Sequence, residues 1–348
     1  MTARFHPRAA WIAAALLALF FVNPPTAVAQ TRARGATISG RVADRFLRAT
    51  PGVLVALLGR DETPPDRIRP VGGMSATTNT LGRYSFTNVP PGDYYLVVLP
   101  NNAQFIADNW PARAGFGITY FPSAKTLDAA KAIKVAGRLP VVANVTMTTA
   151  ALSVISGRVT NAAGKPAAGA ALEIALGGPL TGLRELRATV SEDGRFGLAG
   201  FAPGTYTFRA PEYPWPAPPD VSPKVSAATV VVNGLDQSIR VDPVRLVTVR
   251  GRVTAEGEFV RGALTQSPVF VNAEPVNIDE VFGPPGQSVI REDLSFEFLT
   301  WPGRVLFTAS PSVWRVKAVR WKGKDVTTTL DLPPGETVED LEIELTPD

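Results

Sequence analysis

The sequence predicts an all-β protein made of three tandem β-sandwich domains, and two observations support this prediction. Glycine contributes 30 and proline 32 of the 348 residues, and the short stretches between them alternate apolar and polar residues, as half-buried strands do. One set of motifs also occurs three times, with about 50 residues between its two glycines each time, which is typical of a repeated structural unit.

Each copy opens with a strand motif and continues to a turn motif. The opening motif occupies residues 38–42 (ISGRV), 155–159 (ISGRV) and 249–253 (VRGRV), and the turn motif occupies residues 91–94 (PGDY), 203–206 (PGTY) and 302–305 (PGRV). We therefore predict domains at 36–150, 151–245 and 246–348, each long enough for a core of its own. We refer to these segments as the first, second and third repeats.

The N-terminus has the features of a secretory signal peptide. Arg4 and Arg8 precede an uncharged run at residues 9–22, and the small residues Ala27-Val28-Ala29 follow. This order of a basic start, an apolar core and an Ala-x-Ala end predicts cleavage after Ala29. As a helix, the apolar run is shorter than the roughly 30 Å hydrocarbon core of a bilayer, which disfavours a membrane anchor. We expect an exported protein in the periplasm, at the cell surface or in the medium.

Short strands alternate with turn residues along the rest of the chain. Predicted strands include residues 38–42, 84–86, 95–98, 141–147 and 205–208. Gly92, Gly194 and Gly204 stand where a tight turn needs a positive φ. One short helix is predicted over 126–134, because Leu127, Ala130 and Ile133 have roughly helical spacing.

The motifs resemble a known domain family. The opening ISGRV followed by GRYSFTNVPPGDY at residues 82–94 resembles the carboxypeptidase regulatory-like domain, a seven-stranded transthyretin-like (prealbumin-like, Ig-like) β-sandwich. The third repeat is a divergent copy, with Leu294 and Val305 in place of the hairpin glycine and the tyrosine. The resemblance implies a fold and an exported accessory domain, and it implies no catalytic residues.

A related family, the collagen-adhesin B-type domains of surface pilins, has a similar sandwich with a self-formed Lys-Asn isopeptide bond. The glutamate that catalyses this bond corresponds here to Val98 and Ala210. We therefore do not expect a self-formed cross-link in this chain.

Composition excludes several kinds of chemistry. The chain has no cysteine, and its one histidine is His6 in the predicted signal peptide. Disulfides, cysteine nucleophiles, Ser-His-Asp triads and the usual zinc sites are therefore excluded from the mature chain. The net charge is +4, with the basic residues scattered along the sequence, so we do not expect nucleic acid as a partner. We predict no cofactor and no metal.

Carboxylates are the remaining candidates for acid-base chemistry. Glu192-Asp193 and Glu292-Asp293 precede equivalent hairpins, and a two-carboxylate hydrolase is the less favoured hypothesis. A pair repeated at the same hairpin is more typical of solvated turn residues. Isolated acids such as Asp61-Glu62 and Asp279-Glu280 lack the repeated spacing of a calcium loop and are interpreted as loop residues.

Aromatic residues outside the repeated motifs are the candidate binding residues. They lie in an insertion of the first repeat, residues 101–131, and in a proline-rich segment of the second repeat, and they are Trp110, Phe116, Tyr120, Phe121, Tyr213 and Trp215. Loops at the rim of a sandwich often carry binding function. The insertion either folds over the rim or forms a docking surface for a partner or a neighbouring domain.

The favoured hypothesis is a non-catalytic exported scaffold for protein interaction in the cell envelope or the medium. The alternative is a carbohydrate- or peptide-binding protein that uses the exposed rim aromatics. Its partners would then be polysaccharides or peptides in place of an envelope or extracellular protein.

Overall fold

The computed structural model describes residues 35–60, 67–101, 104–105, 113–212, 224–255, 262, 268–276 and 286–347. Residues Gly35–Asp348 form one compact unit. The predicted signal peptide, Trp110, Tyr213, Trp215, Asp61-Glu62 and Asp279-Glu280 lie outside the described residues.

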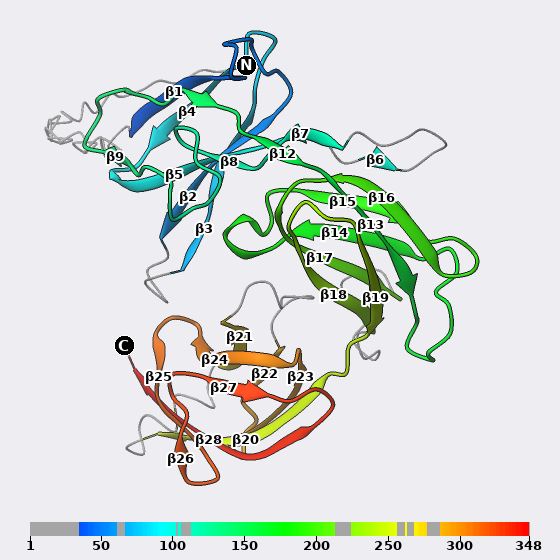
Figure 1. Cartoon of the computed structure of the whole chain (residues 1–348). Helices are drawn as coiled ribbons and strands as arrows, with labels where there is room; N and C mark the ends of the chain where they lie inside the picture. The colour runs from blue at the N-terminus through cyan, green and yellow to red at the C-terminus, as the bar shows by residue number, and fades with distance from the viewer. Residues whose placement is uncertain are drawn as a thin grey trace, which may run out of the picture. The chain divides into compact units, whose positions relative to one another are not determined.

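The first repeat is built around two main sheets (Figure 1). In one, β1 pairs with β4, β10 and β11, and the other has the strand order β3-β2-β5-β8, with β9 also paired to β5. The strands are β1 (Ala36–Ala43), β2 (Leu54–Arg60), β3 (Ile68–Thr77), β4 (Arg83–Val89), β5 (Gly92–Leu99), β8 (Thr119–Tyr120), β9 (Ile133–Val135), β10 (Val141–Val142) and β11 (Val145–Thr146). Side chains from both sheets, including Ile38, Leu57, Phe86 and Leu96, form a buried cluster that we call the first core.

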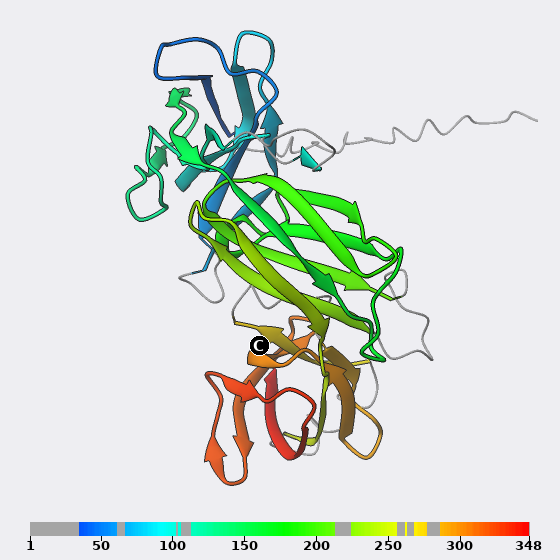
Figure 2. The same ribbon diagram turned by 45° about the vertical axis from the view of Figure 1, so that its right-hand side comes forward.

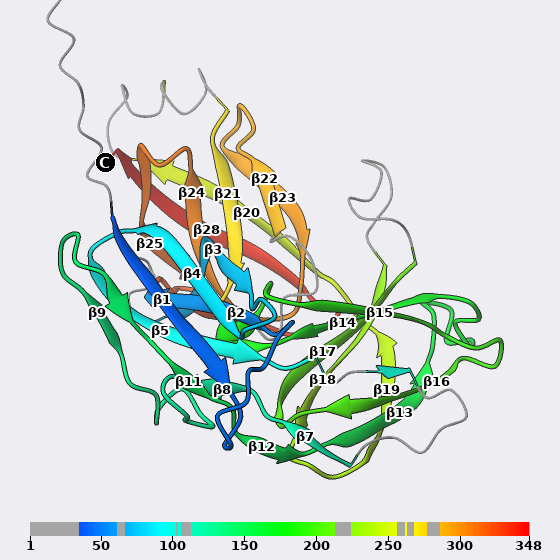
Figure 3. The ribbon, with the colours of Figure 1, turned by 90° about the horizontal axis from the view of Figure 1, so that it is seen from above.

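The second repeat has one continuous sheet of order β15-β14-β17-β18-β19-β13-β16-β6. The strands are β13 (Ser153–Val159), β14 (Ala171–Leu176), β15 (Glu185–Thr189), β16 (Arg195–Phe201), β17 (Gly204–Pro211), β18 (Val225–Val232) and β19 (Gln237–Pro243), and a 3-10 turn η1 (Gly178–Leu180) follows β14. Figure 3 shows β14, β17 and β18 beside one another and β13, β16 and β19 in a second layer. Only two residue pairs, Ser226 with Pro243 and Ala227 with Asp242, join β18 to β19, so the folded sheet encloses its core much as two separate sheets would.

The third repeat again has two sheets, of order β23-β20-β28-β25-β26 and β22-β21-β24-β27. The strands are β20 (Val247–Ala255), β21 (Phe270–Pro275), β22 (Gly286–Val289), β23 (Ser295–Thr300), β24 (Gly303–Ser310), β25 (Trp314–Trp321), β26 (Lys324–Asp325), β27 (Leu330–Leu332) and β28 (Thr337–Pro347). Its buried cluster, the third core, draws only on residues 247–345 and includes Val249, Phe296, Phe307 and Ile343.

The three repeats share one pairing scheme. The opening strand of each repeat runs antiparallel to the hairpin strand and parallel to the closing strand, as β1, β13 and β20 do with their neighbours. A second group of strands pairs as β3-β2-β5-β9, β15-β14-β17-β18 and β22-β21-β24-β27. The prediction of an all-β protein with a β-sandwich fold is therefore confirmed.

The glycine of the opening motif is explained by close packing of the closing strand. A Cβ atom at Gly40, Gly157 or Gly251 would overlap the carbonyl oxygen of Ala143, Ile239 or Leu341, respectively. It would also meet an aromatic side chain of the hairpin strand, which at Gly251 is Phe296, with Cζ at 2.6 Å. Only a residue without a side chain allows these three elements to approach so closely.

Leu294 shows how the third repeat keeps the hairpin without glycine. Gly194 adopts φ 80°, as predicted, and Leu294 takes φ 62° at the equivalent position. In both turns the amide of this residue donates to the carbonyl three residues earlier, Gly194 to Ser191 and Leu294 to Arg291. Leu294 therefore keeps the geometry of the hairpin turn, although a leucine side chain in the left-handed region is sterically unfavourable.

The predicted helix at 126–134 is wrong. Residues 121–129 form turns and bends, with a β-bridge from Ala124 to Tyr120, and the strand β9 begins at Ile133. Ile133 and Val135 alternate into the first core, while Leu127 and Ala130 pack against a different buried cluster. A helix this short is marginal without tertiary support. Here the apolar residues of the segment pack against two different buried clusters, which one face of a helix could not do.

Candidate functional site: the seam between the first two repeats

Two strands of the first repeat are buried on both faces. In β2, Leu57 belongs to the first core, whereas its neighbour Leu58 belongs to a cluster that also contains residues of the second repeat. In β5, Leu96 and Leu99 divide between the two clusters in the same way. We call the second cluster the shared core. Residues 53–58 and 94–99 are nearly continuous apolar runs, which is the pattern of strands covered on both faces, and this signal was not used in the sequence prediction.

The seam is the part of the shared core where the two repeats meet. On the first repeat it consists of Leu58, Leu99, Ile118 and Tyr120, and on the second it consists of Ile174, Leu176, Phe201 and Tyr206. Figure 2 shows the second repeat from a second direction, with its strands in green.

The insertion of the first repeat supplies two short strands near the seam, and a third lies close to the start of the second repeat. They are β6 (Gln104–Phe105), β7 (Ala114–Phe116) and, in the segment that leads into the second repeat, β12 (Thr149–Ala151). β7 pairs with β12, and β6 pairs with β16 of the second repeat. The second repeat's sheet therefore gains a strand from the first repeat, which covers an edge that would otherwise present free backbone groups.

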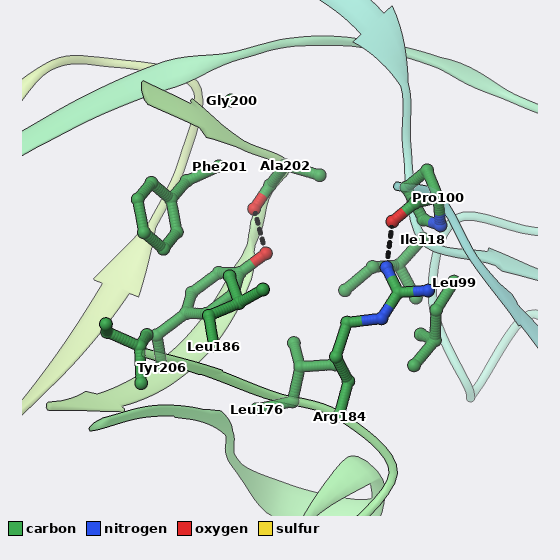
Figure 4. A pocket seen from close by; sticks show the side chains of 11 residues that line it. Leu99, Pro100, Ile118, Leu176, Arg184, Leu186, Gly200, Phe201, Ala202 and Tyr206 are labelled. Atoms are coloured by element: carbon green, nitrogen blue, oxygen red, sulfur yellow. Dashed lines mark hydrogen bonds between the residues drawn. The ribbon is translucent and has the colours of Figure 1, made fainter. Parts of the chain in front are cut away.

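A small cavity lies within the seam (Figure 4). It is lined mainly by apolar side chains of both repeats and has a volume of about 40 Å³. One charged side chain reaches it, Arg184, whose Nη1 donates to the carbonyl of Pro100. A volume this small suits about one water molecule. Pockets that bind small molecules are much larger, at roughly 300–1,000 Å³. The cavity is therefore a packing gap crossed by one inter-repeat hydrogen bond.

The second repeat presents a fixed surface to this cavity. The Tyr206 hydroxyl donates to the carbonyl of Ala202 at 2.9 Å, and the ring meets Phe201 edge to face at 5.0 Å and 88°. Burial raises the pKa of Tyr206, so the hydroxyl stays neutral. Burial also lowers the pKa of Arg184 below its usual value, but an arginine remains charged at any physiological pH.

A surface ion pair also joins the first repeat to the second. Arg113 Nη1 donates to both carboxylate oxygens of Asp236, at 2.6 and 2.7 Å. Oδ1 of the same carboxylate accepts from the amide of Val154 at 2.8 Å. The amide of Leu152 donates to the carbonyl of Arg113 at 3.0 Å. The connection between the repeats is thus held by the insertion and by a turn of the second repeat.

The structure places three of the predicted binding residues against buried clusters. Tyr120 is 6% exposed and belongs to the shared core. Phe116 and Phe121 are half-buried and pack against the first core. The expectation of an exposed ring is wrong for Tyr120, because β8 pairs with β5 and turns this side chain inward. Use of Trp110, Phe116, Phe121, Tyr213 and Trp215 as a binding surface remains a prediction.

The candidate carboxylates form local turns. Asp193 accepts from the Ser191 hydroxyl at 2.7 Å, and Asp293 accepts from the Ser295 hydroxyl at 2.6 Å. These hydrogen bonds are the main reason that the pKa of each aspartate lies below its usual value. A carboxylate held in its ionised form is a poor proton donor, so these two aspartates are unsuited to act as a general acid.

Two further observations concern the described residues alone. They contain no group of three or more His, Cys, Asp and Glu side chains placed to hold a metal ion. They also contain no helix with the length and apolar character needed to cross a membrane.

Comparison with known proteins gives distant matches among solved structures. No protein-family model matches the chain, and no curated protein matches it. Among solved structures, a streptococcal ancillary pilin is 11% identical, with a TM-score of 0.24, covering 90% of this chain and 99% of its own. GBS52, the minor pilin of Streptococcus agalactiae, is 14% identical, with a TM-score of 0.27, covering 60% of this chain and 95% of its own.

A third match is the TIE protein of Bacillus anthracis, which is 12% identical, with a TM-score of 0.22 over 90% of this chain. The present chain spans about half of that protein, 51% of its length. Matches with such low identities and TM-scores carry no functional assignment.

The ion pair at the seam predicts a pH dependence. The hydrogen bond from Val154 and the Arg113 guanidinium hold the pKa of the Asp236 carboxyl below its usual value. A lowered folded-state pKa stabilises the protein above the unfolded value of about 3.9, and this stabilisation is lost as the pH falls through the folded pKa. In thermal melts we expect Asp236→Asn to melt below wild type at neutral pH. The difference should shrink below about pH 4, and a difference that persists unchanged in acid would contradict this assignment.

Proposed function

We propose that this chain is a non-catalytic exported protein of the cell envelope or the medium, in which tandem carboxypeptidase regulatory-like sandwiches form a scaffold for protein interaction. The signal-peptide pattern at residues 1–29 and the motif resemblance support export and the domain type. The observation that carries the proposal is the seam, because it fixes one repeat to the next.

Side chains that could have formed a binding site instead join the first repeat to the second at the seam. Ile118 and Tyr120 of the insertion are buried in the shared core, and Arg184 and Arg113 join one repeat to the other. Loops that bind ligands usually stay accessible and mobile, whereas these groups fix the two repeats together. The first two repeats therefore present their outer surfaces in a defined relation, which suits a scaffold.

Cell fractionation with cross-linking in the native host tests this proposal. We expect the chain in the envelope or secreted fraction, beginning at Gln30, with cross-links to other proteins of that fraction. Recovery from the cytosol with residues 1–29 still attached would contradict export. Hydrolytic turnover that is lost in both Glu192→Gln and Glu292→Gln would contradict the non-catalytic assignment. Capture on a glycan or peptide array through Tyr213 or Trp215 would favour the ligand-binding alternative.

A further inference from the structure

Two turns of the first repeat form a basic and apolar surface at one end of its sheet. Residues 44–48 follow β1, and residues 79–83 lead into β4, the antiparallel neighbour of β1. The Arg41 side chain connects the two turns, because Nε donates to the carbonyl of Leu81 and Nη2 to that of Leu47, both at 3.2 Å. We call this surface the loop tip, and it consists of Arg41, Asp44, Arg45, Phe46, Leu47, Arg48, Leu81 and Arg83.

Three large apolar side chains of the loop tip face solvent. Phe46 is 61% exposed, Leu47 is 72% exposed and Leu81 is 56% exposed. The guanidinium carbons of Arg45 and Arg48 lie over the Phe46 ring, 4.6 and 5.1 Å from its centroid. An exposed phenylalanine in contact with two arginines presents apolar surface and positive charge at the same point.

Both turns are held by side-chain caps. The Asp44 carboxylate accepts from the amides of Phe46 and Arg48, at 2.8 and 2.9 Å, and from Arg48 Nε at 2.7 Å. Asn79 Oδ1 accepts from the amides of Leu81 and Arg83, at 3.0 and 2.9 Å. The exposed apolar residues are therefore fixed in outward positions by the turns that carry them.

The second repeat makes the first of these turns without large side chains. There Asn161 Oδ1 accepts from the amides of Ala163 and Lys165, both at 3.0 Å. The residue in the left-handed conformation is Gly164 at φ 72°, whereas the first repeat places Leu47 there at φ 62°. The turn thus needs only Ala-Ala-Gly, and the first repeat has Arg45, Phe46 and Leu47 instead. Leucine adopts this conformation only with strain, so the fold does not account for its presence.

The second turn of the loop tip also differs from its equivalents, because it has an apolar residue where they have a charged one. Leu81 stands where the equivalent turns of the second and third repeats have Asp193 and Asp293. The loop tip therefore has four arginines and one aspartate, and the only ion pair these arginines make with a described residue joins Arg48 to Asp44. The sequence showed only scattered basic residues, because Arg41 and Arg83 come to this surface from separate strands.

We propose that the loop tip docks on an anionic lipid surface. Phenylalanine and leucine side chains insert at the boundary between headgroups and acyl chains, while arginines pair with lipid phosphates. The loop tip consists of two turns that project beyond paired strands, so its apolar residues suit a soft, flat partner such as a bilayer. Docking on a protein would require a pocket on that partner for each projecting side chain. The excess of arginine selects anionic over zwitterionic lipid.

Vesicle sedimentation tests this proposal with the chain from Gln30 onward, which contains every described strand. We expect binding to vesicles of phosphatidylcholine with about 30% phosphatidylglycerol, weak binding to phosphatidylcholine alone, and loss of binding as salt rises. The test variant is Arg45→Ala/Phe46→Ala/Leu47→Gly, which gives the turn the residues of the second repeat. It should keep its melting temperature and bind at least about tenfold more weakly.

The matched control is Arg138→Ala/Leu139→Ala, which removes an arginine and a 75% exposed leucine elsewhere on the first repeat. It should bind like wild type. Failure of the wild-type chain to sediment with anionic vesicles would overturn the proposal, as would equal losses in the two variants. A Phe46→Ala/Leu47→Gly variant, which keeps all four arginines, provides a further test with polyglutamate as a soluble anion. If this variant and wild type bound polyglutamate equally well, and as tightly as wild type binds vesicles, simple charge attraction would explain the binding and the proposal would be overturned. The scaffold function proposed above does not depend on this contact.

Discussion

Replacing Gly251 with alanine should lower the free energy of unfolding of the third repeat by about 3 kcal/mol or more. The new Cβ would overlap the carbonyl of Leu341 in β28 and lie 2.6 Å from Phe296 Cζ in β23. Both neighbours belong to strands that pair directly with β20, β28 inside the sheet and β23 at its edge, so neither can move without disturbing that pairing. Urea denaturation of the chain, followed by tryptophan fluorescence and circular dichroism, would measure the loss.

The control for this substitution is Gly72→Ala, because a Cβ at Gly72 meets no atom within 4 Å. This variant should unfold within about 0.5 kcal/mol of wild type, as surface substitutions usually do. If Gly251→Ala were as stable as Gly72→Ala, the explanation of the repeated Gly-Arg-Val motif by close strand approach would be wrong.

Ile118→Ala should destabilise the second repeat, although Ile118 belongs to the insertion of the first. Its side chain is 7% exposed, lines the cavity in the seam together with Phe201 and Tyr206, and lies beside Gly204. Truncating a buried isoleucine costs about 2–5 kcal/mol, depending on how well the cavity closes. Hydrogen exchange should therefore accelerate in peptides covering β14 and β17, as well as in the first repeat.

Ile343→Ala is the matched control for this experiment. Ile343 is fully buried in the third core, so the same truncation there should accelerate exchange in β20, β25 and β28 and leave β14 and β17 unchanged. If Ile118→Ala affected only peptides of the first repeat, the two repeats would not share a core in solution.

The repeated motifs predicted the fold because each one has a local physical cause. The glycine in the opening motif, the turn after it and the alternating strand residues all follow from packing within one repeat. Leu294 in the divergent copy still occupies the left-handed conformation of the hairpin. The helix at 126–134 was predicted wrongly because its spacing was read without the sheet that Ile133 and Val135 join.

The seam was harder to predict because it joins residues far apart in sequence. Residues 95–98 are predicted from the sequence as a half-buried strand, whereas the nearly continuous apolar runs at 53–58 and 94–99 indicate strands with two buried faces. The sequence leaves open whether the aromatic residues of the insertion fold over the rim or form a docking surface, and in the structure Tyr120 is buried. The loop tip was missed for a similar reason, since its arginines come from a turn and from two separate strands.

The most direct test of the shared core compares residues 151–245 alone with residues 36–245. The isolated second repeat has its own strands and should fold with a β-type circular dichroism spectrum. It should melt at least about 10 °C lower than in the longer segment, since about 2 kcal/mol shifts the midpoint of a 100-residue domain by that amount. Equal melting temperatures would contradict the account, because they would mean that the second repeat gains nothing from Leu58, Leu99 and Ile118.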